Sequence, residues 1–253
     1  MVGSNKDKKA EILGLLIDQL SMEEVMEKIE DYLSWGRSHK IFYANPHVVL
    51  MARKYPELAS YFNNADIVLP DGYGIVLAAK LLNLPIKRRI IGLDVLLRLS
   101  DLAAEKGWRL YFLGAQNQVL QKSLKILKER FKGINIVGSH HGHFLEAEES
   151  TIVEDITSKN PDIVVVCMGV GKQESFIYKY FQRLAVPVFF GNGGALDFVS
   201  GRIKRAPLWM QKHGLEWIFR FLQEPQRLWK RYTIGNLVFI TLILKEWLKK
   251  HLD

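Results

Sequence analysis

The residues best suited to chemistry in this chain follow short apolar runs of the kind that form buried strands. They stand at six places, namely Asn45, Asp71, Gly114, Gly142, the run from Gly169 to Glu174 and the run from Gly191 to Gly194. Ligands of open parallel sheets bind beyond the carboxyl ends of the strands, where small residues let a phosphate approach backbone amides. Because four of the six places are rich in glycine, the pattern favours a nucleotide or phosphosugar site.

Asp71 is the residue that we expect to be catalytic. It follows the apolar run Ile67–Leu69 and stands between Pro70 and Gly72, where a sheet meets solvent. A carboxylate in this place can take a proton from a hydroxyl nucleophile. Position alone is equally compatible with a structural role, in which Asp71 caps the following helix.

Further ligand contacts are expected from Arg89, Gln173 and Glu174. Arg89 either faces a phosphate or is a surface charge. Gln173 and Glu174 open a helix, so their backbone amides matter as much as their side chains. The familiar nucleotide motifs are absent, because Val166 stands at the first glycine position of a P-loop and Leu196 at the last position of a dinucleotide fingerprint.

A metal ion is not expected. The chain has no Asp-x-Asp, the motif with which many sugar-nucleotide enzymes hold a divalent ion on the diphosphate. The histidines His140, His141 and His143 have no Cys or carboxylate nearby to complete a metal site. We therefore expect no metal and no other cofactor, and a departing diphosphate would have to be stabilised by arginines or helix dipoles.

The last fifth of the chain carries most of its charge. Residues 201–253 contain 11 Lys and Arg against 4 Asp and Glu, and the whole chain has a net charge of +8. Four of the six tryptophans, Trp209, Trp217, Trp229 and Trp247, lie there as well. Basic residues interleaved with aromatic ones suit an anionic membrane surface or a nucleic acid. The structural alternative is a solvated helical face whose tryptophans lie in the core.

The remaining composition indicates a protein of the α/β class from a reducing compartment. The chain has 253 residues, is 48% hydrophobic and holds one cysteine, Cys167, which excludes a disulfide within the chain. No signal peptide is expected at the N-terminus. The apolar run Leu237–Leu244 is too short to cross a bilayer, so it is expected in an interface or a core.

The elements that would position these residues alternate between strands and helices. Strands are predicted at Lys40–Ala44, Ile67–Leu69, Arg109–Leu113, Ile134–Val137, Ile163–Cys167 and Val186–Phe190. Helices are predicted at Met22–Trp35, Val48–Phe62, Gly74–Leu82, Leu93–Lys106, Gln116–Phe131, Glu146–Ser158 and Gln173–Leu184. Ser21 and Glu24 form a capping box for the first of them. The alternation predicts an α/β fold with a mostly parallel, Rossmann-like sheet and helices on both faces.

Residues 201–253 are expected to form a helical appendage to this catalytic domain of residues 1–200. Pro207 can open a helix, which we expect to break near Gly214 and to stop at Pro225. Two more helices are predicted at Gln226–Tyr232 and Asn236–Leu252.

Several segments resemble one enzyme family. They are NPHVVLMAR, ADIVLPDGYGIV, RRIIGLD, YFLGA, GHF, PDIVVVCMGVGKQE, GNGGALDFVSGRIKRAP and GLEWIFRFLQEPQRLWKRY, in this order. In them the chain is similar to the WecG/TagA/CpsF glycosyltransferases, glycosyltransferase family 26. The resemblance implies an inverting, metal-independent transfer of a hexose from a UDP-sugar to a polyprenyl-diphosphate-linked sugar. The sugar is N-acetylmannosamine or its uronic acid in the best-known members, which act on undecaprenyl-diphosphate-GlcNAc at the cytoplasmic membrane face and supply teichoic acid, enterobacterial common antigen or exopolysaccharide.

The resemblance also implies roles for individual residues. Asp71 resembles the general base, and Arg220 and Arg227 resemble arginines that reach the acceptor's diphosphate. Asn45, Arg89 and Gln173 resemble pocket residues of the family. With the strand-end residues added, the residues expected to bind substrate are Tyr43, Asn45, Arg89, Gly114, Gln173, Glu174, Gly193, Gly194 and Arg205. Tyr43 stands where teichoic-acid members have Thr, which leaves the sugar open. Lys230 stands where a third arginine can occur, and it keeps the charge but loses two-pronged phosphate binding.

The sequence therefore predicts a peripheral membrane enzyme on the cytoplasmic face, whose partners are a UDP-sugar, a polyprenyl-linked acceptor and anionic lipid. The same chemistry with another UDP-hexose, such as a glucose-type donor, stays open, and so does association into homo-oligomers. A basic nucleic-acid-binding protein would leave the ligand-like strand ends unexplained, so no nucleic-acid partner is expected. An NAD-type oxidoreductase would need the dinucleotide fingerprint that is absent.

Overall fold

The architecture is taken from a computed structural model, which describes residues 9–252. Its strands are β1 (Lys9–Ile12), β2 (Leu15–Asp18), β3 (His39–Ala44), β4 (Ile67–Pro70), β5 (Arg109–Gly114), β6 (Asn135–His140), β7 (Ile163–Cys167) and β8 (Val188–Gly191). Its first helices are α1 (Met22–Ser34), α2 (Pro46–Lys54), α3 (Pro56–Asn63), α4 (Tyr73–Leu81), α5 (Gly92–Lys106), α6 (Asn117–Arg130), η2 (Glu146–Glu148) and α7 (Glu149–Lys159). They are followed by α8 (Lys172–Leu184), α9 (Ala195–Val199), α10 (Leu208–Lys212), α11 (Glu216–Gln223), α12 (Pro225–Lys230), η3 (Arg231–Gly235) and α13 (Asn236–Leu252).

The predicted α/β fold is confirmed. Six strands form one sheet in the order β4-β3-β8-β7-β5-β6, and the pairs β3–β8, β7–β8, β5–β7 and β5–β6 are all parallel. Strands β3, β7 and β8 are buried along their whole length, as near-continuous apolar runs in a covered parallel sheet should be. The chain divides into two compact units, which are described one after the other.

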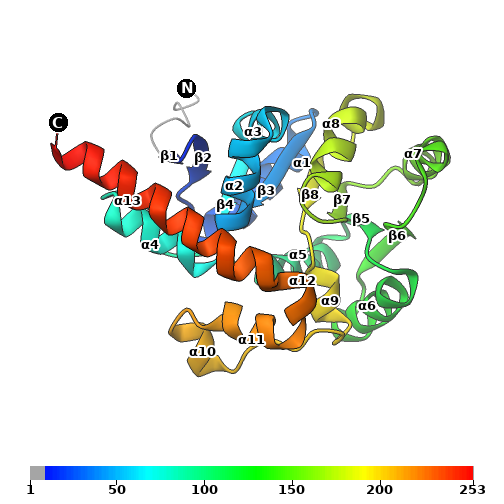
Figure 1. Ribbon diagram of the computed structural model, residues 1–253. Helices are drawn as coiled ribbons and strands as arrows, with labels where there is room; N and C mark the ends of the chain where they lie inside the picture. The colour runs from blue at the N-terminus through cyan, green and yellow to red at the C-terminus, as the bar shows by residue number, and fades with distance from the viewer. Residues whose placement is uncertain (1–8, 253) are drawn as a thin grey trace. The chain divides into compact units, whose positions relative to one another are not determined.

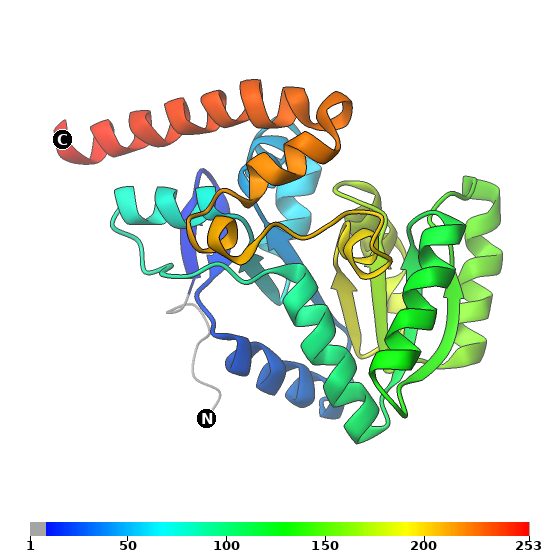
Figure 2. The ribbon, with the colours of Figure 1, turned by 90° about the horizontal axis from the view of Figure 1, so that it is seen from below.

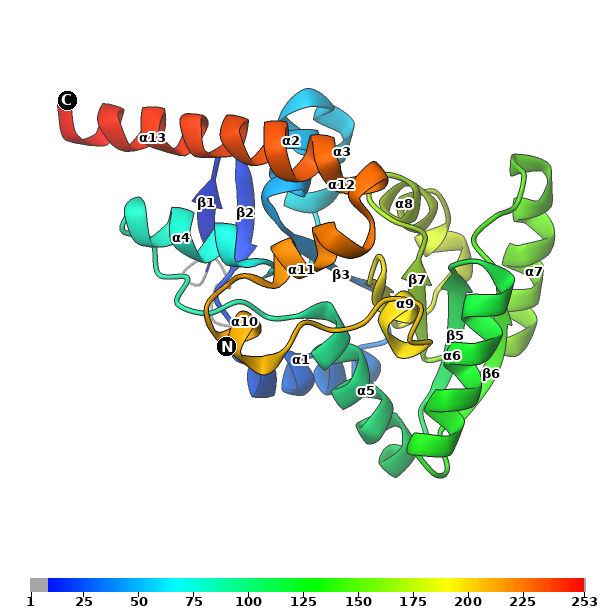
Figure 3. The same cartoon turned by 60° about the horizontal axis from the view of Figure 1, so that its bottom comes forward.

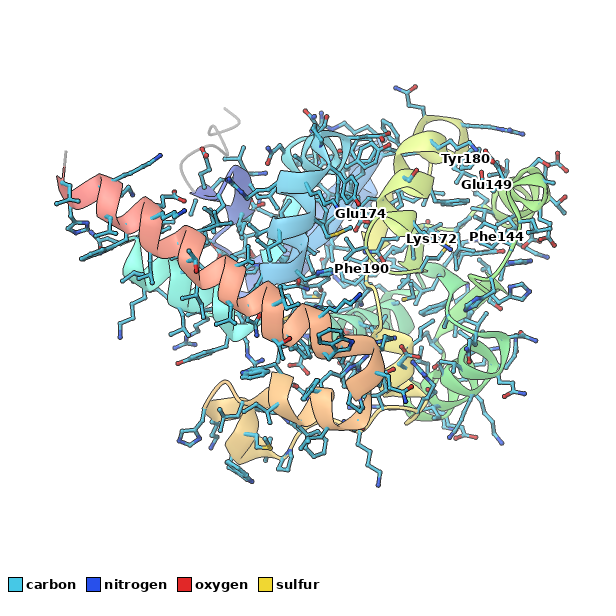
Figure 4. All side chains as sticks on the ribbon, viewed as in Figure 1. Phe144, Glu149, Lys172, Glu174, Tyr180 and Phe190 are labelled. Carbon is cyan, nitrogen blue, oxygen red and sulfur yellow. The ribbon has the colours of Figure 1, made fainter. Side chains whose placement is uncertain are left out.

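Unit 2 comprises residues 21–42 and 92–202 and contains the strands β5 to β8. Right-handed crossovers between parallel strands place α6 on one face of the sheet and α7 and α8 on the other, as Figure 1 shows. Helix α9 packs against α5 and α6. Helices α7 and α8 are joined by Glu149, whose Oε2 accepts hydrogen bonds from Lys179 Nζ at 2.7 Å and Tyr180 Oη at 2.6 Å (Figure 4).

Unit 1 comprises residues 9–20, 43–91 and 203–252, so that the C-terminal helices share a unit with α2, α3 and α4. Helix α13 lies alongside α4 and crosses α2, as Figures 2 and 3 show. Phe239 and Ile243 of α13 are buried in this packing. Strand β2 lies against β4, where Asp18 Oδ2 accepts a hydrogen bond from the Val68 backbone N–H at 2.7 Å.

The structure differs from the predicted elements in several places, among them the short helix α9, which was not predicted. The single helix predicted at Val48–Phe62 is wrong, because the chain becomes extended at Tyr55 and a second helix starts at Pro56. A proline ring clashes with a helical conformation of the preceding residue, which explains the break. The hairpin β1–β2 was not predicted. Its turn places Leu13 and Gly14 at positive φ, as a two-residue hairpin requires.

The C-terminal region follows the prediction more closely. A break between α10 and α11 occurs at Gly214, whose φ is +72°, and α13 spans Asn236–Leu252 as predicted. The capping box at Ser21 and Glu24 is confirmed. Pro225 begins α12, and η3 is a π-helical segment that joins α12 to α13. Among residues 9–252, no helix has the length and hydrophobicity needed to cross a bilayer. The division into a catalytic domain of residues 1–200 and an appendage of residues 201–253 stays a prediction.

Candidate active site

Asp71 lies directly after β4 in unit 1. Its backbone N–H donates a hydrogen bond of 2.8 Å to the carbonyl of Ala44 at the end of β3, which ties the two strand ends together. The helix that follows, α4, has Gly72 as its N-cap, with a φ of +82° and no hydrogen bond from a capping side chain. Because glycine occupies the cap, the alternative role of Asp71 as the cap of this helix is wrong, and its carboxylate remains available for chemistry.

Asn45 holds the Asp71 carboxylate in place. Its Oδ1 accepts a hydrogen bond of 3.1 Å from the Val48 backbone N–H and so caps α2, whose first residue is Pro46. The Asn45 side chain also hydrogen-bonds to the carboxyl of Asp71. One amide therefore fixes both the start of a helix and the orientation of the carboxylate. Tyr43, two residues earlier, is buried at the end of β3.

The surroundings of Asp71 tune its acidity in opposite directions. Burial raises the pKa of the carboxyl above its ordinary value. The guanidinium groups of Arg231 and Arg89 lower this pKa, the Glu216 carboxylate raises it, and the hydrogen bond from Asn45 lowers it. The net effect is a raised pKa, which brings a carboxylate closer to the value that suits a general base near neutral pH.

Arg89 is held inside the same unit by Glu216. Its Nη1 lies 2.6 Å from Glu216 Oε2, and its Nη2 donates a hydrogen bond of 3.0 Å to the backbone carbonyl of Gln211. Arg205 approaches the other oxygen of Glu216 at 4.0 Å. The alternative of a surface charge at Arg89 is therefore wrong, since its side chain is only 16% exposed. Contact of Arg89 with a phosphate stays a prediction.

Arg220 and Arg227 lie on either side of the break between α11 and α12, as predicted. Both pair with one carboxylate: Glu224 Oε2 lies 3.0 Å from Arg220 Nη2 and 2.8 Å from Arg227 Nη2. The structure therefore brings these two arginines together around a single acidic group. A group with several anionic oxygens fits two forked guanidinium groups better than one carboxylate does.

In unit 2 the predicted residues organise a glycine-rich turn. Gln173 and Glu174, in the first turn of α8, are both buried. Gln173 Oε1 accepts a hydrogen bond from the Gly193 backbone N–H at 3.0 Å, and Gln173 Nε2 donates one of 2.8 Å to Glu174 Oε1. Glu174 Oε2 in turn accepts from the Gly171 N–H at 2.6 Å, and burial raises the pKa of this carboxyl (Figure 4). The two side chains thus link the turn before α8 to the turn after β8.

Gly114 is required by a close approach of two strand ends. Its φ is +136°, and a side chain there would overlap the backbone of Cys167 at the end of β7. The neighbouring Ala115 N–H donates to the Cys167 carbonyl at 2.9 Å, and the Gly142 N–H donates to the Ala115 carbonyl at 2.9 Å. Gly193 has a φ of +44°, and Gly194 is exposed as the N-cap of α9. The N–H groups of Ala115, Gly142 and Gly193 are thus hydrogen-bonded within the unit, and the glycines at these turns have no side chain to keep a ligand from the backbone.

Three residues of unit 1 that touch or act on the predicted site were missed from the sequence: Glu216, Glu224 and Arg231. The glutamates carry no sequence signal, because acidic residues on a basic helix resemble ordinary surface charges. Arg231 does have a sequence signal. It stands four residues after Arg227, and this spacing places two residues on one helical face. Within residues 9–252, no group of three or more His, Cys, Asp and Glu is arranged to hold a metal ion.

The fold is that of an α/β protein in which one unit groups a carboxylate with arginines and the other has glycine-rich strand ends. The family model for the glycosyl transferase WecG/TagA/CpsF family matches residues 10–253, and the chain belongs to this family. It is therefore a glycosyltransferase, as the resemblance implied.

Two relatives from bacteria extend over most of the chain. One from Bacillus spizizenii is 35% identical over 214 residues, which cover 85% of this chain and 82% of the relative. One from Staphylococcus aureus is 31% identical over 238 residues, which cover 93% of this chain and 91% of the relative. Both are named N-acetylglucosaminyldiphosphoundecaprenol N-acetyl-beta-D-mannosaminyltransferase.

Proposed function

We propose that this protein transfers N-acetylmannosamine, or its uronic acid, from a UDP-sugar to a polyprenyl-diphosphate-linked GlcNAc. The names of the two relatives support this acceptor and, of the two sugars, N-acetylmannosamine. The observation that carries the proposal is Asp71, a carboxylate at a strand end that is held by Asn45 and surrounded by arginines of the same unit. The arrangement suits a base that acts on a hydroxyl of an anionic substrate.

The proposed reaction is a single displacement. Asp71 takes the proton of the acceptor hydroxyl, whose oxygen forms a bond to the anomeric carbon as the bond from that carbon to UDP breaks. One displacement inverts the configuration at the anomeric carbon. The electron pair of the broken bond leaves with the diphosphate of UDP, and cationic or backbone N–H groups stabilise it without a metal ion.

The two sets of residues are assigned to two substrates. In unit 1, Arg220 and Arg227 bind the diphosphate of the acceptor, which replaces Glu224 as their partner. This assignment is supported by their shared contact with one acidic group. In unit 2, the glycine-rich turns at Gly114 and Gly193 are assigned to the diphosphate of UDP, because they have no side chains that would keep a phosphate from the backbone.

The test is a direct assay of transfer. The protein is incubated with a short-chain polyprenyl-diphosphate-GlcNAc and a panel of UDP-sugars, and the lipid product is identified by mass. A product larger by one N-acetylhexosamine with the UDP-N-acetylmannosamine donor supports the proposal. Retention of full activity in the presence of EDTA is expected, whereas a loss that Mg²⁺ or Mn²⁺ restores would contradict the metal-independent step.

A second donor is favoured by one observation. Tyr43 is bulky and buried at the end of β3, where the teichoic-acid members that the chain resembles have Thr. A larger side chain changes the space left for a sugar, so a glucose-type donor is the second candidate. The same panel decides between them, because the two products differ in mass.

We also propose that the enzyme binds the cytoplasmic face of the membrane through α13. This helix has two apolar faces: Phe239 and Ile243 are buried in unit 1, while another stripe is exposed. The exposed stripe consists of Leu237, Ile240, Leu244, Leu248 and Leu252. Lys245 and Lys249 lie beside it, as in helices that rest in the plane of an anionic lipid surface.

Substitutions test this membrane proposal better than a truncation, because removing α13 would uncover the residues on which Phe239 and Ile243 pack. The double change Leu244→Glu and Leu248→Glu is expected to weaken binding to vesicles that contain phosphatidylglycerol by about 10-fold or more, from the loss of apolar burial. Leu145→Glu, in unit 2 and 73% exposed, is the matched control and should bind as the unchanged protein does. Equal binding of all three proteins would contradict the proposal.

A further inference from the structure

Arg231 opens the π-helical segment η3, which lies between α12 and α13 in unit 1. This segment packs on α2, the helix that Asn45 caps. A π turn takes up one residue more than an α turn, so it changes which side chains share a helical face. The irregular π turn therefore lies where the C-terminal helices pack on α2, the helix capped by Asn45.

The extra residue turns Arg231 toward the packed side of the helix. In an uninterrupted α-helix, at about 100° per residue, Arg231 would lie about 80° from Phe239 and about 120° from Ile243. If the π turn absorbs one residue, both angles fall to about 20°. Since Phe239 and Ile243 are the buried residues of α13, the π turn places Arg231 on the buried face.

Arg231 differs from the other arginines of the candidate site in its partners. Arg89 and Arg205 approach Glu216, and Arg220 and Arg227 approach Glu224. Arg231, by contrast, forms no ion pair within the part of the chain that the structure describes. Its Nε is buried without a hydrogen-bond partner there, a feature that is not peculiar to Arg231 among these arginines. Its guanidinium lies 5.4 Å from the centre of the Tyr232 ring. A buried donor without a partner costs free energy, so its presence calls for a compensating role.

The charge of Arg231 acts on groups from three elements around it. They are Asp71 after β4, His47 in the first turn of α2 and Tyr232 in η3. Burial, with the charge of Arg231 second, lowers the pKa of His47 to about 4, so this imidazole is neutral near pH 7. Among the charges that act on Asp71, that of Arg231 has the largest effect, ahead of Arg89 and Glu216. An unpaired guanidinium on the buried face therefore opposes the effect of burial on the Asp71 carboxyl.

We propose that Arg231 is a positioning residue for the base: its charge favours the ionised form of the Asp71 carboxylate, and the π turn orients its side chain for this role. The inference rests on the proposed role of Asp71. Lys230, the neighbouring residue in sequence, is exposed and does not act on Asp71, so the arginine one position later supplies the charge.

The test is the pH dependence of kcat/KM, measured with the full chain and a water-soluble, short-chain acceptor. Its acid limb reports the pKa of the base in the free enzyme. Removing a nearby cation raises that pKa, so Arg231→Met and Arg231→Gln are expected to move the acid limb upward by about 1 to 3 pH units. Activity should then approach that of the unchanged protein at high pH, and Arg231→Lys should restore most of the limb.

The controls separate this electrostatic role from other causes. Arg53→Met removes an exposed guanidinium from the last turn of α2 and should leave the limb in place. Two neutral variants are used so that one informative protein remains if the other fails to fold, as judged by thermal unfolding. A limb that moves by less than about half a unit in a folded neutral variant, or equally in Arg53→Met, overturns the inference.

Failure of the proposed function gives a different result. If Asp71 is the base, Asp71→Asn removes the acid limb altogether. A limb that survives in Asp71→Asn therefore refutes the role of Asp71. A limb that is lost in Asp71→Asn but stays unmoved in the Arg231 variants refutes only the inference about Arg231.

Discussion

The two units of this glycosyltransferase build their candidate sites in contrasting ways. Unit 1 gathers charged side chains: Asp71, Arg89 and Glu216 act on one another, and Arg220 and Arg227 share Glu224. Unit 2 instead places glycines, which have no side chain, at the turns that follow its strands. Gly114 lies against the Cys167 backbone, and Gly193 offers its N–H to a buried glutamine rather than to a charged group.

The difference indicates which property of a residue each unit depends on. Charges interact strongly where water is largely excluded, so unit 1 should be sensitive to the gain or loss of one charge. Close approach of two backbones depends on volume, so unit 2 should be sensitive to a single added methyl group. The following predictions test this contrast, from the largest expected effect to the smallest.

Asp71→Asn should lower kcat by about 100- to 10,000-fold, because it removes a general base while keeping the volume of the side chain. The measurement is initial rate at saturating substrates, together with binding of UDP, which should survive. Asp101→Asn, at an exposed position, is the matched control and should keep full activity. More than about a third of the activity remaining in Asp71→Asn would exclude Asp71 as the base.

Gly114→Ala should lower the free energy of unfolding by about 3 kcal/mol or more, because the added methyl group overlaps the Cys167 backbone and cannot rotate away. Gly169→Ala is the matched control. Gly169 also has a positive φ, of +87°, but open space surrounds its missing side chain, so only the backbone strain of about 1 to 2 kcal/mol is expected. The free energies of unfolding are measured by chemical denaturation. Equal losses in the two variants would show that the cost at Gly114 comes from its backbone conformation and not from close approach to the Cys167 backbone.

Gln173→Ala should lower the free energy of unfolding by about 1 to 3 kcal/mol, because it leaves the Gly193 N–H and one oxygen of the buried Glu174 without their partner. It should also weaken the binding of UDP, if the turn that Gln173 holds is part of the donor site. Gln116→Ala, at an exposed position, should change stability by less than about 0.5 kcal/mol. A loss in Gln173→Ala as small as that of the control would show that the turn holds its shape unaided.

Glu216→Gln should move the acid limb of kcat/KM to lower pH by less than about one unit. Glu216 raises the pKa of Asp71, so removing its negative charge lowers that pKa and lets Asp71 ionise at lower pH. Glu224→Gln, whose charge is not among those that act on Asp71, should leave the limb in place whatever it does to the rate. An upward shift in Glu216→Gln would contradict the assigned sign, and equal shifts in both variants would contradict the local character of the effect.

Much of the fold could be predicted because its signals are local. The apolar run Ile163–Cys167 is a buried parallel strand with the predicted bounds, and the capping box at Ser21 is present. The break at Gly214 and the bounds of α13 also follow from residues close in sequence. The break at Tyr55 was missed although Pro56 signals it, because the apolar period continues through it.

The sequence predicted which residues belong to the candidate site, but not which partners they contact. Asp71 and Asn45 stand out because each follows a strand, and strand ends are where ligands of such sheets bind. The partners of these residues lie far away in sequence: Arg89 meets Glu216, 127 positions later, and Gln173 meets Gly193, 20 positions later. Contacts over such separations depend on how the elements pack, and a single sequence carries no local record of them.

By itself, the sequence determined the α/β class, the family and the residues available for chemistry, since periodicity, glycine and proline positions and long motifs act through neighbours in the chain. Only the tertiary structure decided how those residues are used. It made Gly72 and not Asp71 the start of α4, gave Arg89 a carboxylate partner, and turned Arg231 inward through a π turn. These three outcomes depend on tertiary packing. Packing decides how deeply a side chain is buried and which charges lie near it, and these two factors set its pKa and its partners independently of its neighbours in sequence.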